Sequence, residues 1–373
     1  MINWFKRNIG EENASEEKAE RLCYSTDASK IKGKTILVIR PETTKQIHHS
    51  ILFLKRNRKT VTIRGGGTGL RGGCVPEDSV VLDTSRMNKI SEVGRDYARV
   101  EPGVTLSKLN NRLKKAGKYF PVSPYSQETC TLGGMIATNA LGRDSLKYGR
   151  TGNWVMEVEI IDGEGRYRKA ELGDVVGKEG TTGIIISAKL KIIDLPKKKK
   201  ITIYKFDYIT ELVFKLKEIK EANSVEFVNK KAATLSGMEP KNYLVIETEA
   251  GNEEEEGNLI EEIYSSLASQ GYTLVEDPKI PTQGIEKFLI WLEKNDIPAF
   301  GPIMSGIIHP VFKSRAMLGK LYDVVEEVDG EIVGNYGIGM IKKEYASSEI
   351  RKRIKELKKK YDPDNVINRG KII

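Results

Sequence analysis

Residues Val61 to Gly73 read Val-Thr-Ile-Arg-Gly-Gly-Gly-Thr-Gly-Leu-Arg-Gly-Gly. A short β-branched strand therefore runs directly into six glycines within nine residues. Glycine lets a backbone approach a ligand with no Cβ in the way, and consecutive N–H groups in such a loop can converge on an anion. The loop is a candidate pyrophosphate site, and a tight turn without a ligand is the alternative.

The loop differs from the two familiar phosphate loops. A P-loop ends in Gly-Lys-Ser/Thr, whereas Gly69 is followed by Leu70 and Arg71. The dinucleotide fingerprint needs a helix that starts inside the glycines, but a second apolar strand, Ser79 to Leu82, follows Gly73 here. The glycines are therefore expected to join one strand to another.

Further motifs follow in a definite order along the chain. They read Val81-Leu-Asp-Thr-Ser-Arg-Met-Asn-Lys-Ile90, Ala98-Arg-Val-Glu-Pro-Gly-Val104, Thr131-Leu-Gly-Gly-Met-Ile-Ala-Thr-Asn-Ala140, Ser145-Leu-Lys-Tyr-Gly149 and Glu179-Gly-Thr-Thr-Gly-Ile-Ile185. Together with the glycine loop they resemble the FAD-binding domain of the vanillyl-alcohol oxidase / p-cresol methylhydroxylase superfamily. The resemblance is greatest to the branch of glycolate oxidase and D-lactate dehydrogenase flavin subunits. It covers roughly Ser25 to Ile193 and returns at Asp362 to Lys371, which is similar to the family's closing Asn-Pro-Gly-Lys.

This resemblance implies FAD as the cofactor, with its pyrophosphate in the glycine loop. The loop residues implied are Arg64, Gly65, Gly66, Gly67, Thr68, Gly69 and Leu70. The other implied cofactor residues are Pro124, Thr131, Gly133, Gly134, Ala137, Asn139, Tyr148, Gly149, Gly180, Gly183, Ile185, Asn368 and Lys371. No histidine lies between His49 and His309, so a histidyl link from the glycine loop is excluded. We expect non-covalent FAD, with a thioether to Cys130 as the disfavoured alternative.

Bulk composition is that of an ordinary water-soluble protein of 373 residues, with 39% hydrophobic and 30% charged residues. No stretch approaches the roughly 18 apolar residues of a membrane span, and the first residues lack a signal-peptide core, so a cytoplasmic location is expected. The net charge of +9 is spread along the chain, with clusters only at Lys197 to Lys200 and Arg351 to Lys360. Neither is interleaved with stacking aromatics, which argues against nucleic acid and allows at most peripheral membrane association.

The three cysteines, Cys23, Cys74 and Cys130, form no Cys-x-x-Cys pair. This chain alone therefore cannot build an Fe–S cluster or a structural zinc site. If electrons leave through an Fe–S relay, that relay belongs to a partner subunit.

We expect an α+β protein, with a two-part FAD-binding domain at residues 1–195 and 334–373 and a cap domain at 196–333. Helices are predicted from Pro41 to about Asn57 and from Leu106 to Ala116, the second capped by Thr105. Beyond Pro196 the pattern indicates a ferredoxin-like βαββαβ cap. Its expected elements are strand Ile201–Phe206, helix Ile209–Ala222, strands Ser224–Val228 and Tyr243–Thr248, helix Leu259–Ser269 and strand Tyr272–Val275.

The resembled dehydrogenases carry two metal-binding and catalytic stretches in this part of the chain. In the family these read His-x-x-Gly-Asp-Gly-Asn-x-His and Gly-Glu-His-Gly-Ile-Gly, where two histidines and the glutamate hold a divalent metal and the next histidine is the base. Here they read Pro302-Ile-Met-Ser-Gly-Ile-Ile-His309 and Gly334-Asn-Tyr-Gly-Ile-Gly339. Only His309 remains of the three metal ligands, so no metal is expected, since a catalytic metal normally has about three protein ligands.

Two residues are left as candidates for the proton acceptor, Tyr336 and His309. An imidazole titrates near neutral pH without help, whereas a phenol needs its pKa lowered. Each side chain could equally be structural.

The expected activity is hydride transfer from a small hydroxy acid or related alcohol, with glycolate or D-lactate favoured, to FAD. The alternative is a flavin-binding electron-transfer or structural subunit of a larger complex that has no catalysis of its own.

Overall fold

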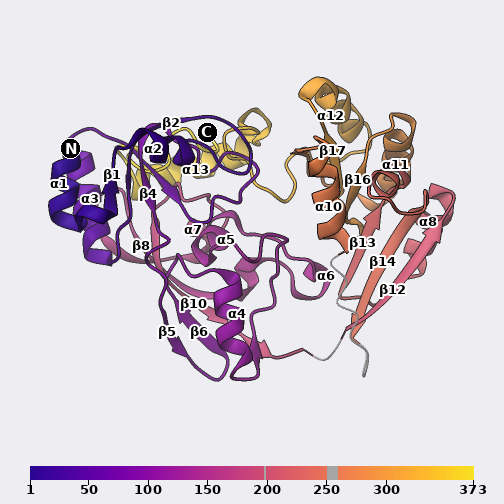
Figure 1. Ribbon diagram of the computed structural model, residues 1–373, viewed down its shortest axis with the longest axis horizontal. Helices are drawn as coiled ribbons and strands as arrows, with labels where there is room; N and C mark the ends of the chain where they lie inside the picture. The colour runs from indigo at the N-terminus through magenta and orange to yellow at the C-terminus, as the bar shows by residue number, and fades with distance from the viewer. Residues whose placement is uncertain (197–198, 250–258) are drawn as a thin grey trace. The chain divides into compact units, whose positions relative to one another are not determined.

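The structure is a computed structural model that describes residues 1–196, 199–249 and 259–373 (Figure 1). The chain forms two compact units. The first contains Met1–Leu141, Arg150–Leu195 and Tyr336–Ile373, and the second contains Gly142–Gly149 and Pro196–Asn335. The segment Gly142–Gly149 therefore groups with the second unit, although it lies inside the stretch 1–195 that the sequence assigns to the first domain.

One sheet of the first unit carries the glycine loop. Its strand order is β1-β2-β4-β3, and β4 runs parallel to both β2 and β3. The bounds are β1 (Ala14–Ser15), β2 (Lys34–Ile39), β3 (Val61–Arg64) and β4 (Glu77–Asp83). The loop joins β3 to β4 with no helix between them, as predicted. The loop begins at the carboxyl end of β3, and because β4 runs parallel to β3, the connection must return to the opposite end of the sheet.

Helices α1 (Ile2–Ile9) and α3 (Thr44–Arg56) complete the core of this sheet. Helix α3 lies within the predicted range, and its apolar residues Ile47, Ile51 and Leu54 are fully buried there. The Thr43 hydroxyl caps the helix by accepting from the Gln46 N–H at 3.2 Å.

The second sheet of this unit has the strand order β5-β6-β10-β8-β9, with all neighbours antiparallel. Its strands are β5 (Ile90–Val93), β6 (Tyr97–Val100), β8 (Val155–Ile161), β9 (Tyr167–Ala170) and β10 (Ile184–Lys191). Helix α4 (Leu106–Lys114) forms where it was predicted and buries Leu106, Leu109 and Leu113 against this sheet, and Thr105 caps it as predicted. The remaining elements of the unit are α2 (Lys18–Tyr24), β7 (Lys118–Tyr119), α5 (Leu132–Thr138), α7 (Leu172–Val175), β11 (Ile193–Asp194) and α13 (Ser348–Tyr361).

The C-terminal residues return to the first unit and close the edge of the glycine-loop sheet. Helix α13 contributes Leu357 and Tyr361 to the core of the second sheet. After it, Ile367 forms a parallel bridge with Val61, the first residue of β3. The strand that leads into the glycine loop is therefore held between β4 and the C-terminal segment.

The second unit is built on one six-stranded sheet of order β12-β14-β13-β16-β17-β15. Its elements are α6 (Ser145–Tyr148), β12 (Lys199–Phe206), α8 (Ile209–Glu218), β13 (Ser224–Val228), α9 (Lys230–Leu235), β14 (Asn242–Glu249), α10 (Leu259–Ser269), β15 (Leu274–Val275), α11 (Ile285–Lys294), β16 (Ala299–Pro302), β17 (His309–Phe312) and α12 (Leu318–Glu327). Helices α8, α11 and α12 share one apolar core with Val225, Phe227 and Leu244 of the sheet.

The sheet order differs in one respect from the ferredoxin-like order expected from the sequence. The first three strands are arranged as expected, with β14 between β12 and β13. The expected fourth strand, β15, should lie beside β12 but pairs with β17 at the other edge. The segment after β15 supplies two extra strands, β16 and β17, which extend the sheet on the β13 side and offer β15 its partner.

Candidate flavin site

The glycine loop packs so closely against a neighbouring turn that two of its glycines have no room for a side chain. A Cβ added at Gly65 would lie 2.2 Å from Thr131 Oγ1, and one added at Gly66 would lie 2.1 Å from the Thr129 carbonyl oxygen. Both distances are far below van der Waals contact. The structure thus brings the loop beside the turn that begins α5, two segments that the sequence assigned to the same cofactor.

The loop also presents a row of backbone donors. Within the described part of the chain, no hydrogen bond has the N–H of Gly65, Gly66, Gly67, Thr68 or Gly69 as its donor. Gly66 and Gly69 are exposed, and a Cβ at Gly69 would meet no atom within 4 Å. Consecutive N–H groups that are open to a ligand form an anion-binding concavity, so these residues fit the pyrophosphate of FAD.

Arg64, the last residue of β3, stabilises this loop through contacts of its guanidinium group. Its Nη1 donates to the Thr26 carbonyl oxygen at 2.6 Å, and its guanidinium carbon lies 5.2 Å from the centre of the Tyr24 ring. Gly67 has a φ of +67°, and a Cβ there would lie 2.3 Å from Arg64 Nη2. Contacts with Tyr24 and Thr26 hold the arginine in place, and its contact with Gly67 constrains the backbone path of the loop.

The turn at α5 is ordered by its own caps. The Thr131 hydroxyl accepts from the Gly134 N–H at 3.4 Å, and Asn139 ends the helix in the left-handed region with φ of +50°. Asn139 Oδ1 then accepts from the Gly152 N–H at 2.8 Å. Gly133 is a packing glycine, since its Cβ would lie 2.6 Å from Pro102 Cβ. Ala137 and Pro124 are half-buried in this region.

Gly180 lies against the end of the chain. A Cβ there would lie 2.8 Å from Asn368 Nδ2 and 3.5 Å from Ile63 Cδ1. Asn368 donates from Nδ2 to the Glu179 carbonyl oxygen at 2.8 Å and accepts through Oδ1 from the Ile63 N–H at 2.8 Å. Its side chain thus positions the strand that enters the glycine loop, and its cofactor contact stays a prediction.

Three further predicted cofactor residues, Lys371, Ile185 and Gly183, pack against other parts of the first unit. Lys371 is completely buried, and its Nζ donates to the Val75 carbonyl oxygen. Burial lowers the pKa of this ammonium group to about 8, against the opposing effect of Glu77. Ile185 belongs to the core of the second sheet, and a Cβ at Gly183 would meet Ile160 Cδ1 at 2.7 Å. These residues shape the unit around the loop.

Tyr148 and Gly149 belong to the second unit, in the segment Gly142–Gly149. Asp144 anchors this segment: its two carboxylate oxygens accept from Lys199 Nζ at 2.8 and 2.7 Å, and Lys199 also reaches Glu247 Oε2 at 2.9 Å. Asp144 and Glu247 are almost completely buried. Burial alone would lower the pKa of Lys199, but the two carboxylates outweigh it and raise that pKa.

The candidate base Tyr336 lies in the first unit beside the glycine loop. Its ring centre is 5.4 Å from the guanidinium carbon of Arg71, which is 2% exposed. Two residues further on, Ile338 and Gly339 donate their N–H groups to the Glu179 carboxylate at 2.7 and 2.8 Å. Burial raises the pKa of this carboxyl group, and the two N–H donors, Lys371 and Arg71 oppose the rise.

The candidate base His309 lies in the second unit and is 1% exposed. Its Nδ1 is 3.1 Å from the Glu276 carbonyl oxygen. A carbonyl can only accept, so Nδ1 carries a proton and Nε2 is the nitrogen able to take one. The ring packs 5.7 Å from the Phe300 ring.

Neither Cys74 nor Cys130, the two cysteines near the expected cofactor residues, has thiolate character. Burial raises the pKa of the Cys74 thiol to about 12 and that of the Cys130 thiol to about 11. A thiol that stays protonated is a poor nucleophile. This supports non-covalent FAD.

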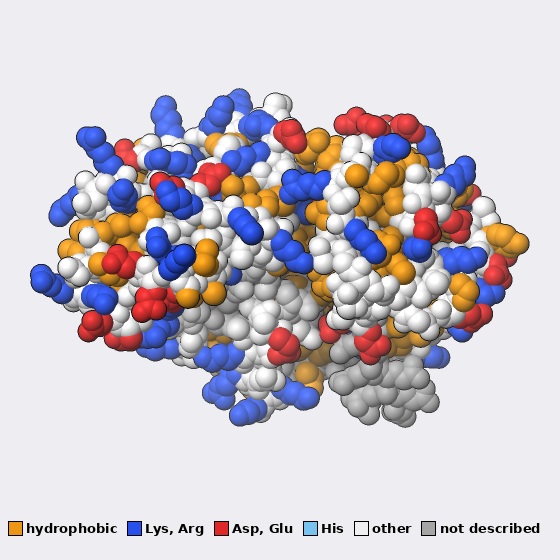
Figure 2. Space-filling model, turned by 45° about the horizontal axis from the view of Figure 1, so that its top comes forward, with side chains coloured by type: hydrophobic (Ala, Val, Ile, Leu, Met, Phe, Trp, Pro, Cys, Tyr) orange, Lys and Arg blue, Asp and Glu red, His pale blue; other side chains and the backbone are white. Residues whose placement is uncertain are grey.

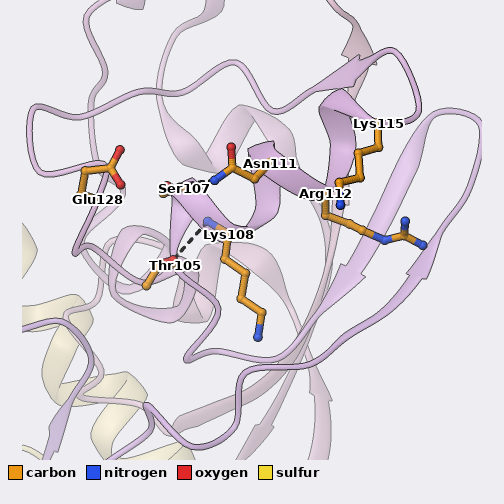
Figure 3. Close-up of a pocket in the computed structure, with 7 residues that line it drawn as sticks. All are labelled: Thr105, Ser107, Lys108, Asn111, Arg112, Lys115 and Glu128. Carbon is orange, nitrogen blue, oxygen red and sulfur yellow. Dashed lines mark hydrogen bonds between the residues drawn. The ribbon is translucent and has the colours of Figure 1, made fainter.

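A surface pocket of about 470 Å³ lies in the first unit (Figure 3). It is lined by Thr105, Ser107, Lys108, Asn111, Arg112, Lys115 and Glu128, none of which is an expected FAD residue. Figure 2 shows Lys and Arg side chains interspersed with acids over the visible face, not gathered in one stripe. Among the described residues no group of three or more His, Cys, Asp or Glu side chains could hold a metal ion. Nor is any helix in the described ranges both long and apolar enough to cross a membrane.

Two family models match the chain. One, described as "FAD binding domain", matches residues 35–171, and the other, "FAD linked oxidases, C-terminal domain", matches residues 311–372. The chain belongs to the FAD-linked oxidase family. The first match contains the glycine loop and the α5 turn. The second contains Tyr336, Asn368 and the last two residues of β17, but it begins after His309.

This FAD-linked oxidase is similar to curated proteins over nearly its whole length. It is 27% identical to glycolate oxidase subunit GlcD of Bacillus subtilis over 97% of this chain and 94% of that protein. It is 26% identical to D-lactate dehydrogenase of Archaeoglobus fulgidus over 91% and 92%. A solved structure of alkyldihydroxyacetonephosphate synthase matches 99% of this chain and 84% of its own with a TM-score of 0.75 at 16% identity, which shows the shared fold.

Two charged residues of this oxidase were missed by sequence reasoning. Arg71 stands inside the glycine loop and Glu179 directly precedes Gly180, yet both are buried. The sequence signal that could have identified Arg71 and Glu179 is a charged residue within a glycine-rich or apolar motif. Their partners, Tyr336 and the Ile338–Gly339 backbone, are far away in sequence and became visible only in the fold.

Proposed function

We propose that this protein binds FAD non-covalently and oxidises a small hydroxy acid or related alcohol, with a 2-hydroxy acid such as glycolate or D-lactate favoured. The observation that carries the proposal is the row of five backbone N–H groups from Gly65 to Gly69 that no described acceptor uses. The names of the relatives supply the substrate class. FAD, when bound, supplies the acceptor for the substrate's hydride.

The chain's own residues would bind the cofactor and move one proton. The glycine loop would hold the pyrophosphate through its backbone N–H groups, and the Thr129–Thr131 segment would support the loop by packing against Gly65 and Gly66. The hydroxyl proton of the substrate passes to Tyr336 or to Nε2 of His309, the two candidate bases. Electrons then leave to an acceptor, for which an Fe–S partner subunit is one candidate, because this chain has no Cys-x-x-Cys pair of its own.

The test is to purify the protein, load it with FAD and add 2-hydroxy acids without oxygen. We expect yellow protein that releases FAD on denaturation and is bleached by at least one hydroxy acid. Bleaching only by a partner protein would support the electron-transfer subunit instead. Folded protein that cannot be loaded with FAD would reject both.

A variant of Gly69 assigns the loop to the cofactor. Because no protein atom lies within 4 Å of a Cβ at this position, Gly69→Ala should fold normally. If the pyrophosphate lies on the loop, this variant should bind FAD at least about tenfold more weakly, which corresponds to about 1.4 kcal/mol. Gly173→Ala is the matched control, since its Cβ also meets nothing within 4 Å and it is not a predicted cofactor residue.

A further inference from the structure

The segment from Tyr336 to Ile341 wraps around one buried carboxylate. Glu179 Oε1 accepts from the Ile338 N–H at 2.7 Å, and Oε2 accepts from the Gly339 N–H at 2.8 Å. The Glu179 residue is 8% exposed. Each oxygen of the carboxylate therefore holds one adjacent backbone donor, in the manner of an anion in a backbone nest.

Two glycines allow the segment to follow this path. Gly337 has a φ of +83°, and a Cβ there would lie 2.6 Å from Glu179 Oε1. Gly339 has a φ of +53°, and its Cβ would lie 2.0 Å from the Arg71 carbonyl oxygen. Any larger residue at either position would push the segment away from the carboxylate or from the glycine loop.

The same segment is tied to the end of the glycine loop. The Met340 N–H donates to the Arg71 carbonyl oxygen at 2.8 Å, and the Arg71 guanidinium lies over the Tyr336 ring. Tyr336 is thus located by contacts on both sides of it: Arg71 at its ring and Glu179 at the backbone two and three residues further along the chain.

The main chain of Glu179 has a different task from its side chain. Its N–H donates to the Ala137 carbonyl oxygen at 2.7 Å, and its own carbonyl oxygen accepts from Asn368. These main-chain bonds hold the Gly180 turn against α5 and β3. A substitution that changes only the side chain should therefore release the Tyr336 segment and leave intact the main-chain bonds that support the expected cofactor residues.

We propose that the Glu179 carboxylate is a positioning residue that fixes the Tyr336–Gly339 turn and thereby the Tyr336 phenol, without contributing to FAD binding. The catalytic part of this inference rests on the proposed function. In this proposal Glu179 touches neither substrate nor cofactor and acts only through the backbone donors that its two oxygens hold. The proton acceptor whose position it sets is Tyr336.

The test variant is Glu179→Gln, which keeps the shape of the side chain but points an NH₂ group at one of the two backbone donors. A backbone donor bonds more strongly to a charged carboxylate than to a neutral amide, so amide hydrogen exchange at Ile338 and Gly339 should become at least about tenfold faster. FAD affinity should stay within about threefold of the wild type. Reduction by the hydroxy acid should slow at least about tenfold and take the pH profile of Tyr336→Phe.

Two further variants make the outcome decisive. Glu179→Asp keeps the charge and should partly restore slow exchange. Asp174→Asn removes another buried carboxylate of the same unit, which accepts from Lys360 and Tyr361, and should lower stability without changing exchange at Ile338 and Gly339. Unchanged exchange in Glu179→Gln overturns the inference, and so does a loss of FAD affinity that matches the loss of activity.

The same measurements distinguish this inference from the proposed function. Wild-type protein that binds FAD but is reduced by no hydroxy acid rejects the proposed activity, while the exchange comparison still decides whether Glu179 holds the turn. Normal reduction in Tyr336→Phe rejects Tyr336 as the proton acceptor and leaves His309.

Discussion

Asn368 and Glu179 lie 189 residues apart in the chain and are joined by a 2.8 Å hydrogen bond from the Asn368 side-chain amide to the Glu179 carbonyl oxygen. The same amide group accepts from the Ile63 N–H. One buried side chain thus connects the strand that enters the glycine loop with the Gly180 turn. Asn368 therefore holds together two short backbone segments, β3 and the Gly180 turn, that are far apart in the sequence.

Asn368→Ala should therefore weaken both the fold and cofactor binding. Loss of two buried hydrogen bonds should lower the free energy of unfolding by about 2–3 kcal/mol and FAD affinity by at least about tenfold. Chemical denaturation and FAD titration measure the two effects. Asn365→Ala is the control, because Asn365 is exposed and has a similar φ of +51°, so it tests backbone strain alone. Equal losses in both variants would show that the amide bonds are unimportant.

Gly67→Ala should abolish flavin binding while Cys74→Ala should retain it. At a φ of +67°, alanine costs on the order of 1–3 kcal/mol in backbone strain, and its Cβ would displace Arg64. Cys74 lies beside Arg64 and Asp27, but its thiol is no expected ligand. FAD occupancy after gel filtration measures the difference. Full occupancy in Gly67→Ala would mean that the loop does not hold the cofactor.

Chelators should leave activity unchanged. Pro302 has no side-chain donor atom, and Asn335 offers only a neutral amide oxygen, so His309 is the one family ligand position that this sequence keeps. Dialysis against a chelator followed by elemental analysis and the reduction assay checks this. About one equivalent of transition metal per chain, removed together with activity, would contradict the prediction.

Stability should rise as the pH increases from about 8 toward 10.5, in part because of Lys371. Its folded pKa is lowered to about 8 from an ordinary value of 10.5, so between these values the unfolded chain binds more protons than the folded one. Below pH 8 the folded state carries a buried ammonium group at a cost of up to about 3 kcal/mol. In Lys371→Met this increment with pH should vanish. An unchanged slope of unfolding free energy against pH in the variant would refute the assignment.

Lys199→Met should destabilise the second unit by about 3–5 kcal/mol, because it leaves the buried carboxylates of Asp144 and Glu247 without their shared cation. Lys205→Met on the same strand is the control. That lysine pairs with Glu239 on the surface, where ion pairs contribute little. Thermal unfolding of both variants gives the comparison, and similar shifts in the two would contradict the prediction.

Local sequence patterns predicted several elements of the fold. Strands β3 and β13 and helices α3 and α4 form where they were predicted, because each of these patterns is contained within its own element. Helix α8 ends at Glu218 and not at Ala222, yet Ile219 and Ala222 still pack against the core. The apolar pattern thus continued past the last helical residue.

Strands β16 and β17 were not resolved from the sequence for a different reason. The stretch that contains them includes Pro298, Gly301, Pro302, Gly306 and Pro310. Proline and glycine normally argue against a strand. Pairing with β13 and β15 overrides this local preference.

The sequence predicted the members of the candidate site, and the structure adds the protein contacts that several of them make. The glycine loop and the α5 turn do lie together. Asn368 and Lys371, however, turn into the protein, because buried backbone groups near them need partners. Glu179 and Arg71 were missed, since the groups that give them meaning lie more than a hundred residues away.

The bridge between Val61 and Ile367 has a consequence for biosynthesis. The ribosome completes β3 and the glycine loop early, but the residues that cover the free edge of β3 are made about three hundred residues later. During translation that edge stays exposed, as an incomplete sheet that a second nascent chain or a chaperone could occupy. A polypeptide that ends before Val366 would leave this edge of β3 uncovered, and such a product would be a substrate for proteolysis.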